Sequence, residues 1–520
     1  MSETSEKLSL WRRLNNRVAS ALAVVAQRFP HLARWLGIVR RRRRPITVLV
    51  FFGLHVAGFF CSVQAVMQTR TEQGAVAWAI SLNAVPIVAV PAWFVFGDSD
   101  LDSYVATRRA GLAEIRPTAE RFLENLDAAR APVSLADHSD ELRRTLQRLA
   151  SMPWMKGNQA DLLVDGKNTF HSIYQAIDEA EDYVLVQFYI FRDDETGGEL
   201  RRRLIEKAES GVRVRVLLDN YGCLDLPGDF IEEMRAAGIE AELFMDLTGE
   251  ANRFQLNFRN HRKIVVVDGK VGFVGGHNVG DEYLGMHPEL TPWRDSHLRI
   301  AGPAAKALQV AFVEDWHWAT GEIPEGLDWS IDPADFAGET DALILASGPS
   351  DPVETCSMFF LATLYGARER IWIATPYFVP DDKIVTALQA AAIRGVDVRV
   401  LMPELSDSTL VKLSSYSYLD ELDKVGVKLY RYQNGFLHQK VLVMDDSLSA
   451  IGSANFDNRS FRLNFEVTGI IHDREFTDQV AAMLEEDFAV STRATARDYA
   501  EKRFPFRLAV RVARMLAPIQ

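Results

Sequence analysis

Residues 260–278 read NHRKIVVVDGKVGFVGGHN, and residues 437–455 read LHQKVLVMDDSLSAIGSAN. Each stretch contains the pattern H-x-K-x4-D, runs through apolar, β-branched residues, and ends in Gly-Gly or Gly-Ser followed by Asn. The two copies comprise His261, Lys263 and Asp268, then His438, Lys440 and Asp445. A single copy would indicate little, because a lone histidine in a strand is usually packed or solvated. Two copies with the same spacing predict a two-histidine phosphoryl-transfer site built from a duplicated unit.

The region around the two copies alternates strand and helix patterns in two rounds. Buried-strand patterns flank a helical pattern in each round: 183–191, 199–210 and 212–219, then 370–379, 382–394 and 396–402. The interval between His261 and His438 is 177 residues. The sequence therefore predicts an α/β fold of two similar halves, at 159–335 and 336–500.

Side-chain direction favours catalysis at the two copies. Residues i and i+2 of a strand project from the same face, so His261 and Lys263 point the same way, as do their counterparts in the second copy. If the halves pack about a pseudo-twofold axis, two histidines and two lysines converge. An imidazole can attack phosphorus and its partner can protonate the leaving oxygen. The lysines stabilise charge on the phosphoryl oxygens.

Other polar residues fit supporting roles. Asn278, Ser453 and Asn455 follow the lysines at matching distances and are predicted to donate hydrogen bonds to the phosphate. Each histidine also needs a carboxylate to select its tautomer, and we assign Asp295 and Glu466 to that role.

Two parts of the pattern leave alternatives open. Asp268 and Asp445 are expected at strand ends, as part of the catalytic set through a base or as structural turn residues. Gly276 stands where the second copy has Ser453, so the two halves are not equivalent. No cluster in the sequence has metal-ligand spacing, and neither a metal nor another cofactor is predicted.

Composition restricts the class of protein. The net charge is −13, yet residues 1–44 carry eleven Lys/Arg against two Glu, so this arm is +9 and the rest −22. An acidic body argues against a general nucleic-acid binder, and the basic arm suggests anionic lipid, RNA or a simple topology signal. The three cysteines make neither a disulfide framework nor a zinc site.

Two uncharged segments predict a membrane anchor. Residues 46–67 and 75–97 lack charged residues, and each is long enough to span a bilayer of about 30 Å as a helix. The hairpin at 45–97 has Trp78 and Trp93 as candidates for the two membrane interfaces. The alternative is a pair of buried core helices.

The anchor predicts an orientation. Five arginines at 40–44 precede the first helix and Arg108 and Arg109 follow the second, so both ends are expected in the cytoplasm. Residues 98–158 are predicted to be a helical linker. Residues 501–520 form a basic, apolar tail that is expected to lie on the membrane or against the catalytic region.

These motifs resemble the phospholipase D superfamily, whose hallmark is H-x-K-x4-D-x6-G-[SG]-x-x-N. The segments GNQADLLVDG, WRDSHLRIAGPA, TPYFVPDD and GSANFDNRSFRLNFE are similar to the bacterial cardiolipin synthases within it, over about residues 75–520. Gly276 in place of Ser departs from the commoner form of the motif but is compatible with it.

The resemblance implies a multi-pass enzyme of the bacterial inner membrane that moves a phosphatidyl group between two phosphatidylglycerols. It implies a phosphatidyl-histidine, with free glycerol as product. The resemblance favours His261 as nucleophile and His438 as acid and then base, and the sequence alone leaves the reverse order open. The alternatives are a phospholipase D-type hydrolase, a transferase with another donor or acceptor lipid, a membrane-tethered nuclease, and a non-catalytic scaffold.

Overall fold

The computed structural model describes residues 43–68, 72–97, 117, 120–126, 139–244, 258–332 and 336–520. The predicted arm at 1–44 lies outside this part of the chain except for Arg43 and Arg44, as does much of the predicted linker. The chain divides into two compact units, Met1–Leu101 and Asp102–Gln520.

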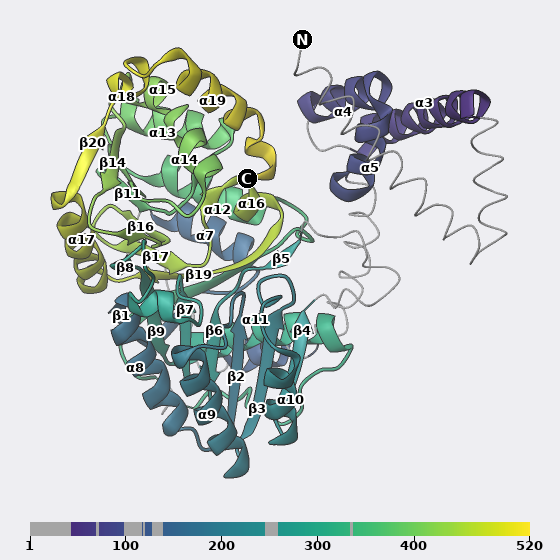
Figure 1. The fold of residues 1–520 in the computed structure, drawn as a ribbon. Helices are drawn as coiled ribbons and strands as arrows, with labels where there is room; N and C mark the ends of the chain where they lie inside the picture. Colours follow the sequence, from purple (N-terminus) through teal and green to yellow (C-terminus); the bar gives the residue numbers. More distant parts are fainter. Residues whose placement is uncertain are drawn as a thin grey trace, which may run out of the picture. The chain divides into compact units, whose positions relative to one another are not determined.

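One mixed sheet runs through the second unit, which is the body of the protein (Figure 1). The first half contributes β1 (Met155–Val164), β2 (Tyr183–Phe188), β3 (Arg213–Asp219), β4 (Glu240–Phe244), β6 (Ile264–Val267), β7 (Val271–Gly275) and β9 (Ser296–Ala301). The second half contributes β10 (Thr340–Ser347), β11 (Arg370–Ala374), β13 (Asp397–Pro403), β14 (Lys428–Tyr432), β16 (Val441–Met444), β17 (Leu448–Gly452), β19 (Asn464–His472) and β20 (Ser491–Ala494).

The strand order confirms the duplication. The antiparallel neighbours β1 and β10 lie at the centre, and the order outward is β1-β9-β7-β6-β2-β3-β4 on one side. On the other side it is β10-β19-β17-β16-β11-β13-β14, so each strand has its counterpart at the same place, with β20 added at the edge. The predicted α/β fold of two similar halves is therefore correct.

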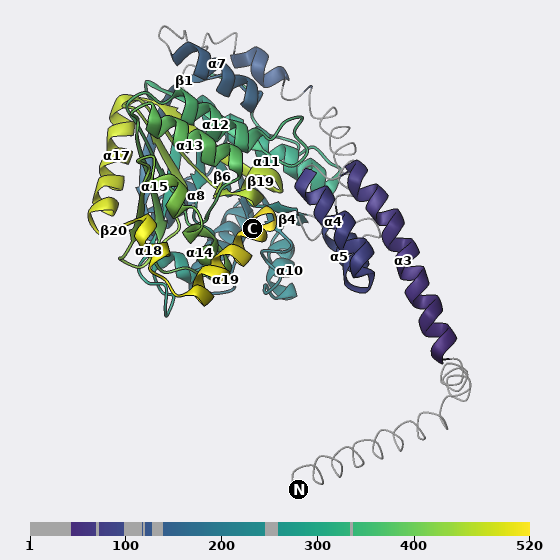
Figure 2. The ribbon, with the colours of Figure 1, turned by 90° about the horizontal axis from the view of Figure 1, so that it is seen from above.

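Successive residues of a strand point to opposite faces of the sheet, so they pack into hydrophobic cores on opposite sides of it. In β16, Val443 packs with α17 (Arg474–Ala489) and Leu442 with α13 (Asp382–Ile393), which lie on opposite sides of these strands (Figure 2). The core that contains α17 also contains α11 (Pro303–Thr320) of the first half. The halves are therefore joined by side-chain packing as well as by the sheet.

Short strands cross between the halves. β5 (Arg259–Asn260) of the first half pairs in parallel with β19 of the second. β15 (Phe436–Leu437) of the second half pairs in parallel with β8 (Trp293–Arg294) of the first. Each motif histidine directly follows one of these crossing strands, so it lies against the opposite half.

The end of the predicted linker belongs to the body. β1 begins at Met155, inside the segment 98–158, and α7 (Ser139–Ala150) buries Leu146 in the core of the second half. At these residues, the predicted linker is therefore a helix that packs on the body through its apolar face.

The described residues of the N-terminal unit form α3 (Arg43–Gln68), α4 (Glu72–Ala84) and α5 (Pro86–Phe96). Among the described helices, only α3 is long and apolar enough to span a membrane, over Val48–Met67. It packs closely on α4, because a Cβ at Gly58 would lie 2.2 Å from the Leu82 carbonyl oxygen.

The second predicted span, at 75–97, is not a single helix. Pro86 lacks a backbone N–H and starts a new helix after Val85. The rings of Trp78 and Trp93 lie 5.1 Å apart, whereas a straight helix would separate them by about 22 Å. The chain therefore folds back between α4 and α5, and the expectation that these tryptophans occupy opposite interfaces is wrong.

The tail forms α19 (Phe504–Met515), which packs on α14 (Thr409–Tyr416). Val510 and Ala513 are buried, and the Phe506 ring meets the Tyr416 ring edge-on at 5.3 Å. Gln520 is also buried, and its carbonyl oxygen accepts the N–H of Arg459 in α16 (Asn458–Arg462).

Candidate active site

The two motif histidines are held by the backbone of the opposite half. The His261 N–H donates to the Phe465 carbonyl oxygen at 2.9 Å, and the His438 N–H donates to the Arg294 carbonyl oxygen at 2.7 Å. These acceptors immediately precede Glu466 and Asp295. The backbone pairing therefore places each histidine beside the carboxylate of the other half.

The side chains complete two His–carboxylate pairs. His261 Nδ1 lies 2.9 Å from Glu466 Oε2, and His438 Nδ1 lies 2.7 Å from Asp295 Oδ2. Both carboxylates are fully buried. With Nδ1 engaged, Nε2 of each ring is the nitrogen available for chemistry. The structure thus brings together the histidines and the residues assigned to orient them.

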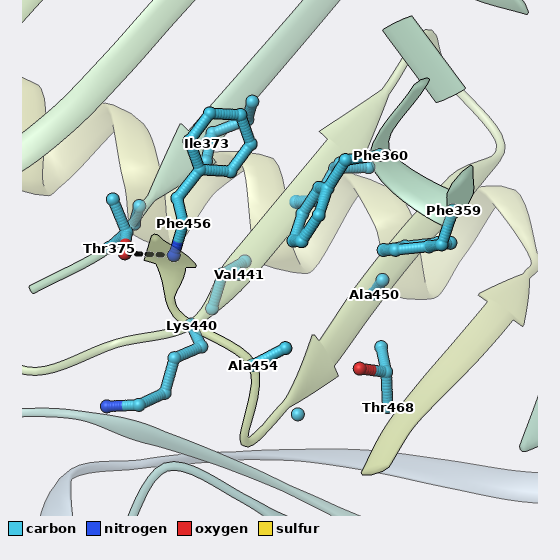
Figure 3. Close-up of a pocket in the computed structure, with 13 residues that line it drawn as sticks. Phe359, Phe360, Ile373, Thr375, Lys440, Val441, Ala450, Ala454, Phe456 and Thr468 are labelled. Atoms are coloured by element: carbon cyan, nitrogen blue, oxygen red, sulfur yellow. Dashed lines mark hydrogen bonds between the residues drawn. The ribbon is translucent and has the colours of Figure 1, made fainter. Parts of the chain in front are cut away.

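The lysines lie on the same side as the histidines. Lys263 Nζ donates to the His261 carbonyl oxygen at 2.7 Å, and Lys440 Nζ donates to the His438 carbonyl oxygen at 2.5 Å. The stem of Lys440 lines a small pocket with Phe359, Phe360 and Phe456, and its amine points away from these rings (Figure 3). The apolar wall stiffens the stem and leaves the amine to the site.

Burial controls the protonation of the four residues. It lowers the pKa of His261 to about 4, despite the opposing effect of Glu466, and lowers that of His438 well below its ordinary value. Burial also lowers the pKa of Lys440 to about 8 and that of Lys263 well below its usual range. Both imidazoles are therefore neutral at neutral pH in the free site, which suits a nucleophile, whereas a histidine that acts as an acid must first take up a proton.

The two carboxylates differ. Burial opposes ionisation of Glu466, but His261 and Lys263 outweigh it and hold the pKa of Glu466 below its ordinary value. Burial raises the pKa of Asp295. The Glu466–His261 pair is therefore better prepared to carry a positive charge on its ring.

The Gly276/Ser453 difference follows from the carboxylates. A Cβ at Gly276 would lie 2.1 Å from Asp295 Oδ1, so only glycine fits beside the short aspartate. In the second half, Ser453 Oγ donates to Glu466 Oε2 at 2.6 Å, and Ser460 Oγ donates to Glu466 Oε1 at 2.8 Å. Ser453, predicted to bind phosphate, is thus placed to position Glu466.

The two asparagines also make local contacts. Asn278 accepts the Ile190 N–H through Oδ1 at 3.1 Å and donates through Nδ2 to the Tyr283 hydroxyl at 2.6 Å, which commits both ends of its amide. Asn455 Oδ1 is buried without a hydrogen-bond partner among the described residues. Of the three residues predicted to bind phosphate, Asn455 is thus the one with a group still unsatisfied.

Asp268 and Asp445 lie at the other end of their strands, away from the histidines. The Asp268 carboxylate accepts the N–H groups of residues 181–183, and the Asp445 carboxylate accepts those of residues 368–370. Both have positive φ, 53° and 54°. These contacts match the turn role that the sequence left open, at the start of β2 or β11, and a part for either aspartate in catalysis stays a prediction.

A network behind His261 was not foreseen from the sequence. Asn260 and Arg262 point away from the site, and both donate to Asp315 Oδ2 of α11, at 2.8 and 2.9 Å. Arg262 Nε also donates to the Glu466 carbonyl oxygen at 3.1 Å. These buried contacts hold the two segments that carry His261 and Glu466. The sequence signal for them was the alternation of residues around His261, which turns Asn260 and Arg262 away from the site.

No metal-binding group emerges: within the described residues, no three His, Cys, Asp or Glu side chains are gathered to hold an ion.

Comparison with known proteins agrees with this geometry. Residues 173–316 and 360–488 match the family described as "Cardiolipin synthase, PLD-like domain". Cardiolipin synthase A of Pseudomonas putida (strain GB-1) is 44% identical over 476 residues, which cover 90% of this chain and 98% of that protein.

The chain belongs to the cardiolipin synthase family of the phospholipase D superfamily. Cardiolipin synthase A of Pseudomonas entomophila (strain L48) is 45% identical over the same proportions. The crystal structure of a phosphatidylserine synthase from Haemophilus influenzae Rd KW20 shares the fold, with a TM-score of 0.57 and 13% identity, over 73% of this chain and 100% of that one.

Proposed function

We propose that this protein is a cardiolipin synthase that transfers a phosphatidyl group from one phosphatidylglycerol to a second and releases glycerol. The observation that carries the proposal is the pair of His–carboxylate contacts exchanged between the halves, in a chain of this family. Such a site provides one nucleophile and one proton carrier, which a two-step phosphoryl transfer requires.

In the first step, neutral His261 attacks the phosphorus of the donor lipid through Nε2. The bond from phosphorus to the glycerol headgroup breaks, and His438, which must first take up a proton at Nε2, gives that proton to the departing oxygen. Glu466, whose pKa is held low, stabilises the positive charge that develops on the His261 ring. The lysine amines offset charge on the phosphoryl oxygens.

In the second step, His438 is neutral and accepts the proton of a terminal hydroxyl on the second phosphatidylglycerol. That oxygen attacks phosphorus, the P–N bond to His261 breaks, and cardiolipin leaves. One diester is broken and one is formed, so the exchange balances without an energy-supplying cofactor.

The test uses full-length protein in phosphatidylglycerol vesicles, with cardiolipin, glycerol and phosphatidic acid quantified. We expect cardiolipin and glycerol in equal amounts, and neither product from the His261→Ala or His438→Ala variant. Phosphatidic acid in place of cardiolipin would instead establish a hydrolase. DNA cleavage without lipid turnover would establish the nuclease.

We propose that α3 spans the inner membrane and that the basic clusters at 40–44 and 108–109 both lie in the cytoplasm. The positive-inside rule supports this arrangement, but α4 and α5 fold back on each other in the structure, so a return crossing requires that fold-back to open. Single cysteines placed at positions 20 and 112 should both be labelled by an impermeant maleimide only after cell lysis. Labelling of position 112 in intact spheroplasts would contradict the cytoplasmic body.

The outer face of α19 supports contact of the body with anionic lipid. Phe504, Leu508 and Val512 are exposed at successive turns, and Arg503, Arg507 and Arg511 form a parallel row beside them. An apolar stripe flanked by arginines fits the boundary between headgroups and acyl chains. The tail would then both pack on the body and touch the bilayer.

A further inference from the structure

The two flanks of the paired histidines are chemically different. The motif interval of 177 residues matches Arg259 with Phe436, and Arg459 with Glu282, the second residue of the 3-10 helix Asp281–Leu284 as Arg459 is the second residue of α16. The flank beside His261 therefore carries two guanidinium groups where the flank beside His438 carries a phenyl ring and a carboxylate. A difference at equivalent positions of a duplicated site points to two different ligands.

Arg259 faces the site. It precedes His261 by two residues, and the intervening Asn260 turns the other way toward Asp315. Its Nη1 donates to the Tyr189 hydroxyl at 3.1 Å, and the Tyr189 and His261 rings meet edge-on at 5.0 Å. Its guanidinium also stacks on Tyr221 at 4.2 Å. Arg259 is therefore linked to the reacting histidine through one aromatic ring.

Arg459 approaches the same place from the second half. It belongs to α16, which packs on β19, and β19 pairs Asn464 with Arg259 in register. Its neighbour Ser460 holds Glu466. Burial and then Arg259 lower the pKa of Arg459, so the two guanidiniums interact unfavourably.

Among the described residues, the acids near Arg259 already accept backbone N–H groups. Asp219 accepts the N–H groups of Tyr221, Gly222 and Asn260, and Asp457 accepts that of Ser460. Arg259 makes no ion pair within the described residues, and its Nε is buried without a hydrogen-bond partner there. A bound anion would satisfy this nitrogen and relieve the repulsion between the two arginines.

The opposite flank has no such demand. The ring of Phe436 packs on Trp293 at 4.7 Å and lies 5.8 Å from the His438 ring. Glu282 is paired with Arg192 at 3.3 Å. The flank beside His438 is therefore aromatic, and its one carboxylate, Glu282, is already paired with Arg192.

We propose that Arg259 and Arg459 bind the phosphodiester of the acceptor phospholipid, the phosphate that does not react. The assignment rests on the proposed function. The acceptor phosphate is one glycerol away from its attacking hydroxyl, so it must be held close to the reacting phosphorus but outside the pair of histidines. Two interacting guanidiniums, with the Tyr189 ring between Arg259 and His261, provide such a place, and planar arginines suit phosphate oxygens.

The acceptor lipid can be replaced by an acceptor without a phosphate while the donor lipid stays the same. The difference between the two reactions then measures the proposed acceptor-phosphate site alone. Full-length protein in phosphatidylglycerol vesicles is given labelled free glycerol, a neutral acceptor that returns the intermediate to phosphatidylglycerol. Label exchange and cardiolipin formation are measured together for wild type, Arg259→Gln, Arg459→Gln and Arg259→Lys. The matched control is Arg192→Gln, which removes one positive charge from the opposite flank.

We expect both Gln variants to lose about tenfold or more in cardiolipin formation, with glycerol exchange within about threefold of wild type. Arg259→Lys should recover part of the loss, and Arg192→Gln should lower neither reaction selectively. Equal loss of both reactions in the Gln variants, or no loss of either, would overturn the acceptor site. Absence of cardiolipin in wild type, with phosphatidic acid formed, would instead refute the proposed function.

Discussion

Asp295 of the first half accepts a hydrogen bond from His438 of the second, across 2.7 Å, while Glu466 of the second half holds His261 of the first. The exchange is enforced by backbone pairing of β8 with β15 and of β5 with β19. Neither half contains a complete His–carboxylate pair of its own. The site therefore depends on the registry between the halves.

Asp295→Asn is expected to lower kcat by about 10²- to 10⁴-fold, because an amide can present N–H to Nδ1 and select the wrong tautomer of His438. The rate of cardiolipin formation in vesicles measures the effect. Asp161→Asn, which removes a partly exposed ion pair with Arg299 in the same half, is the control and should leave kcat unchanged. A variant at position 295 with normal kcat would show that the pair does not orient His438.

Asp445→Asn should lower stability by about 1–3 kcal/mol and leave kcat per folded molecule near that of wild type, because the carboxylate accepts N–H groups at a turn. Asparagine tolerates the positive φ of 54°, so the change isolates the carboxylate. Thermal unfolding in detergent and activity together measure it. Asp446→Asn, whose partner Arg474 is largely exposed, should change stability by less than about 1 kcal/mol. Loss of activity at full stability in Asp445→Asn would support the catalytic assignment.

The rate should fall on the alkaline side with a midpoint near pH 8. The pKa of Lys440 is lowered by burial to about 8, so its amine is charged below that pH and loses its charge as pH rises through it. The pH profile of kcat/KM reports groups of the free enzyme and is the measurement. Lys440→Arg stays charged, so any activity that it retains should no longer fall near pH 8. A wild-type profile that stays flat to pH 10 would contradict the role of the charged amine.

Gly276→Ser, which copies the second half into the first, should abolish most activity. The added Cβ would lie 2.1 Å from Asp295 Oδ1, so the carboxylate must move and release His438. Activity and thermal unfolding are compared with Gly198→Ala, where nothing lies within 4 Å of the new Cβ and the α9 helix (Glu195–Glu209) should gain up to about 1 kcal/mol. Unchanged activity in Gly276→Ser would mean that Asp295 is not confined there.

Leu508→Asp and Val512→Asp should weaken the contact of α19 with anionic vesicles and lower the rate on vesicular phosphatidylglycerol several-fold, because both side chains are about half exposed on its apolar stripe. The rate on short-chain lipid in detergent micelles should stay the same. Glu485→Gln, on the exposed face of α17, is the control. Equal rates on vesicles for all three variants would show that α19 does not contact the membrane.

The repeated motif was sufficient to predict the duplicated α/β fold, because spacing and strand periodicity are local properties of the chain. It also identified Asp295 and Glu466, since a histidine in such a site requires a carboxylate. Which carboxylate serves which histidine depends on β5 and β15, two-residue strands that pair only across the halves. Strands so short leave no periodic signal.

Other differences have equally specific causes. Asp268 shares its spacing with the motif but lies beyond the end of β6, where backbone N–H groups are nearer than the histidines. Pro86 marks the break between α4 and α5, but the fold-back that brings Trp78 to Trp93 depends on packing between helices. Arg259 would have required comparison of the two motif copies residue by residue outside the conserved pattern.

The exchange of carboxylates between halves also constrains inheritance. After the duplication that produced this chain, neither copy could become redundant, since each supplied a residue that the other needed. An ancestor with one copy would have needed two chains to assemble the same site, and joining them made that encounter permanent. Loss of either carboxylate therefore disables the histidine of the neighbouring copy, so a lesion and its consequence lie in different halves of the gene.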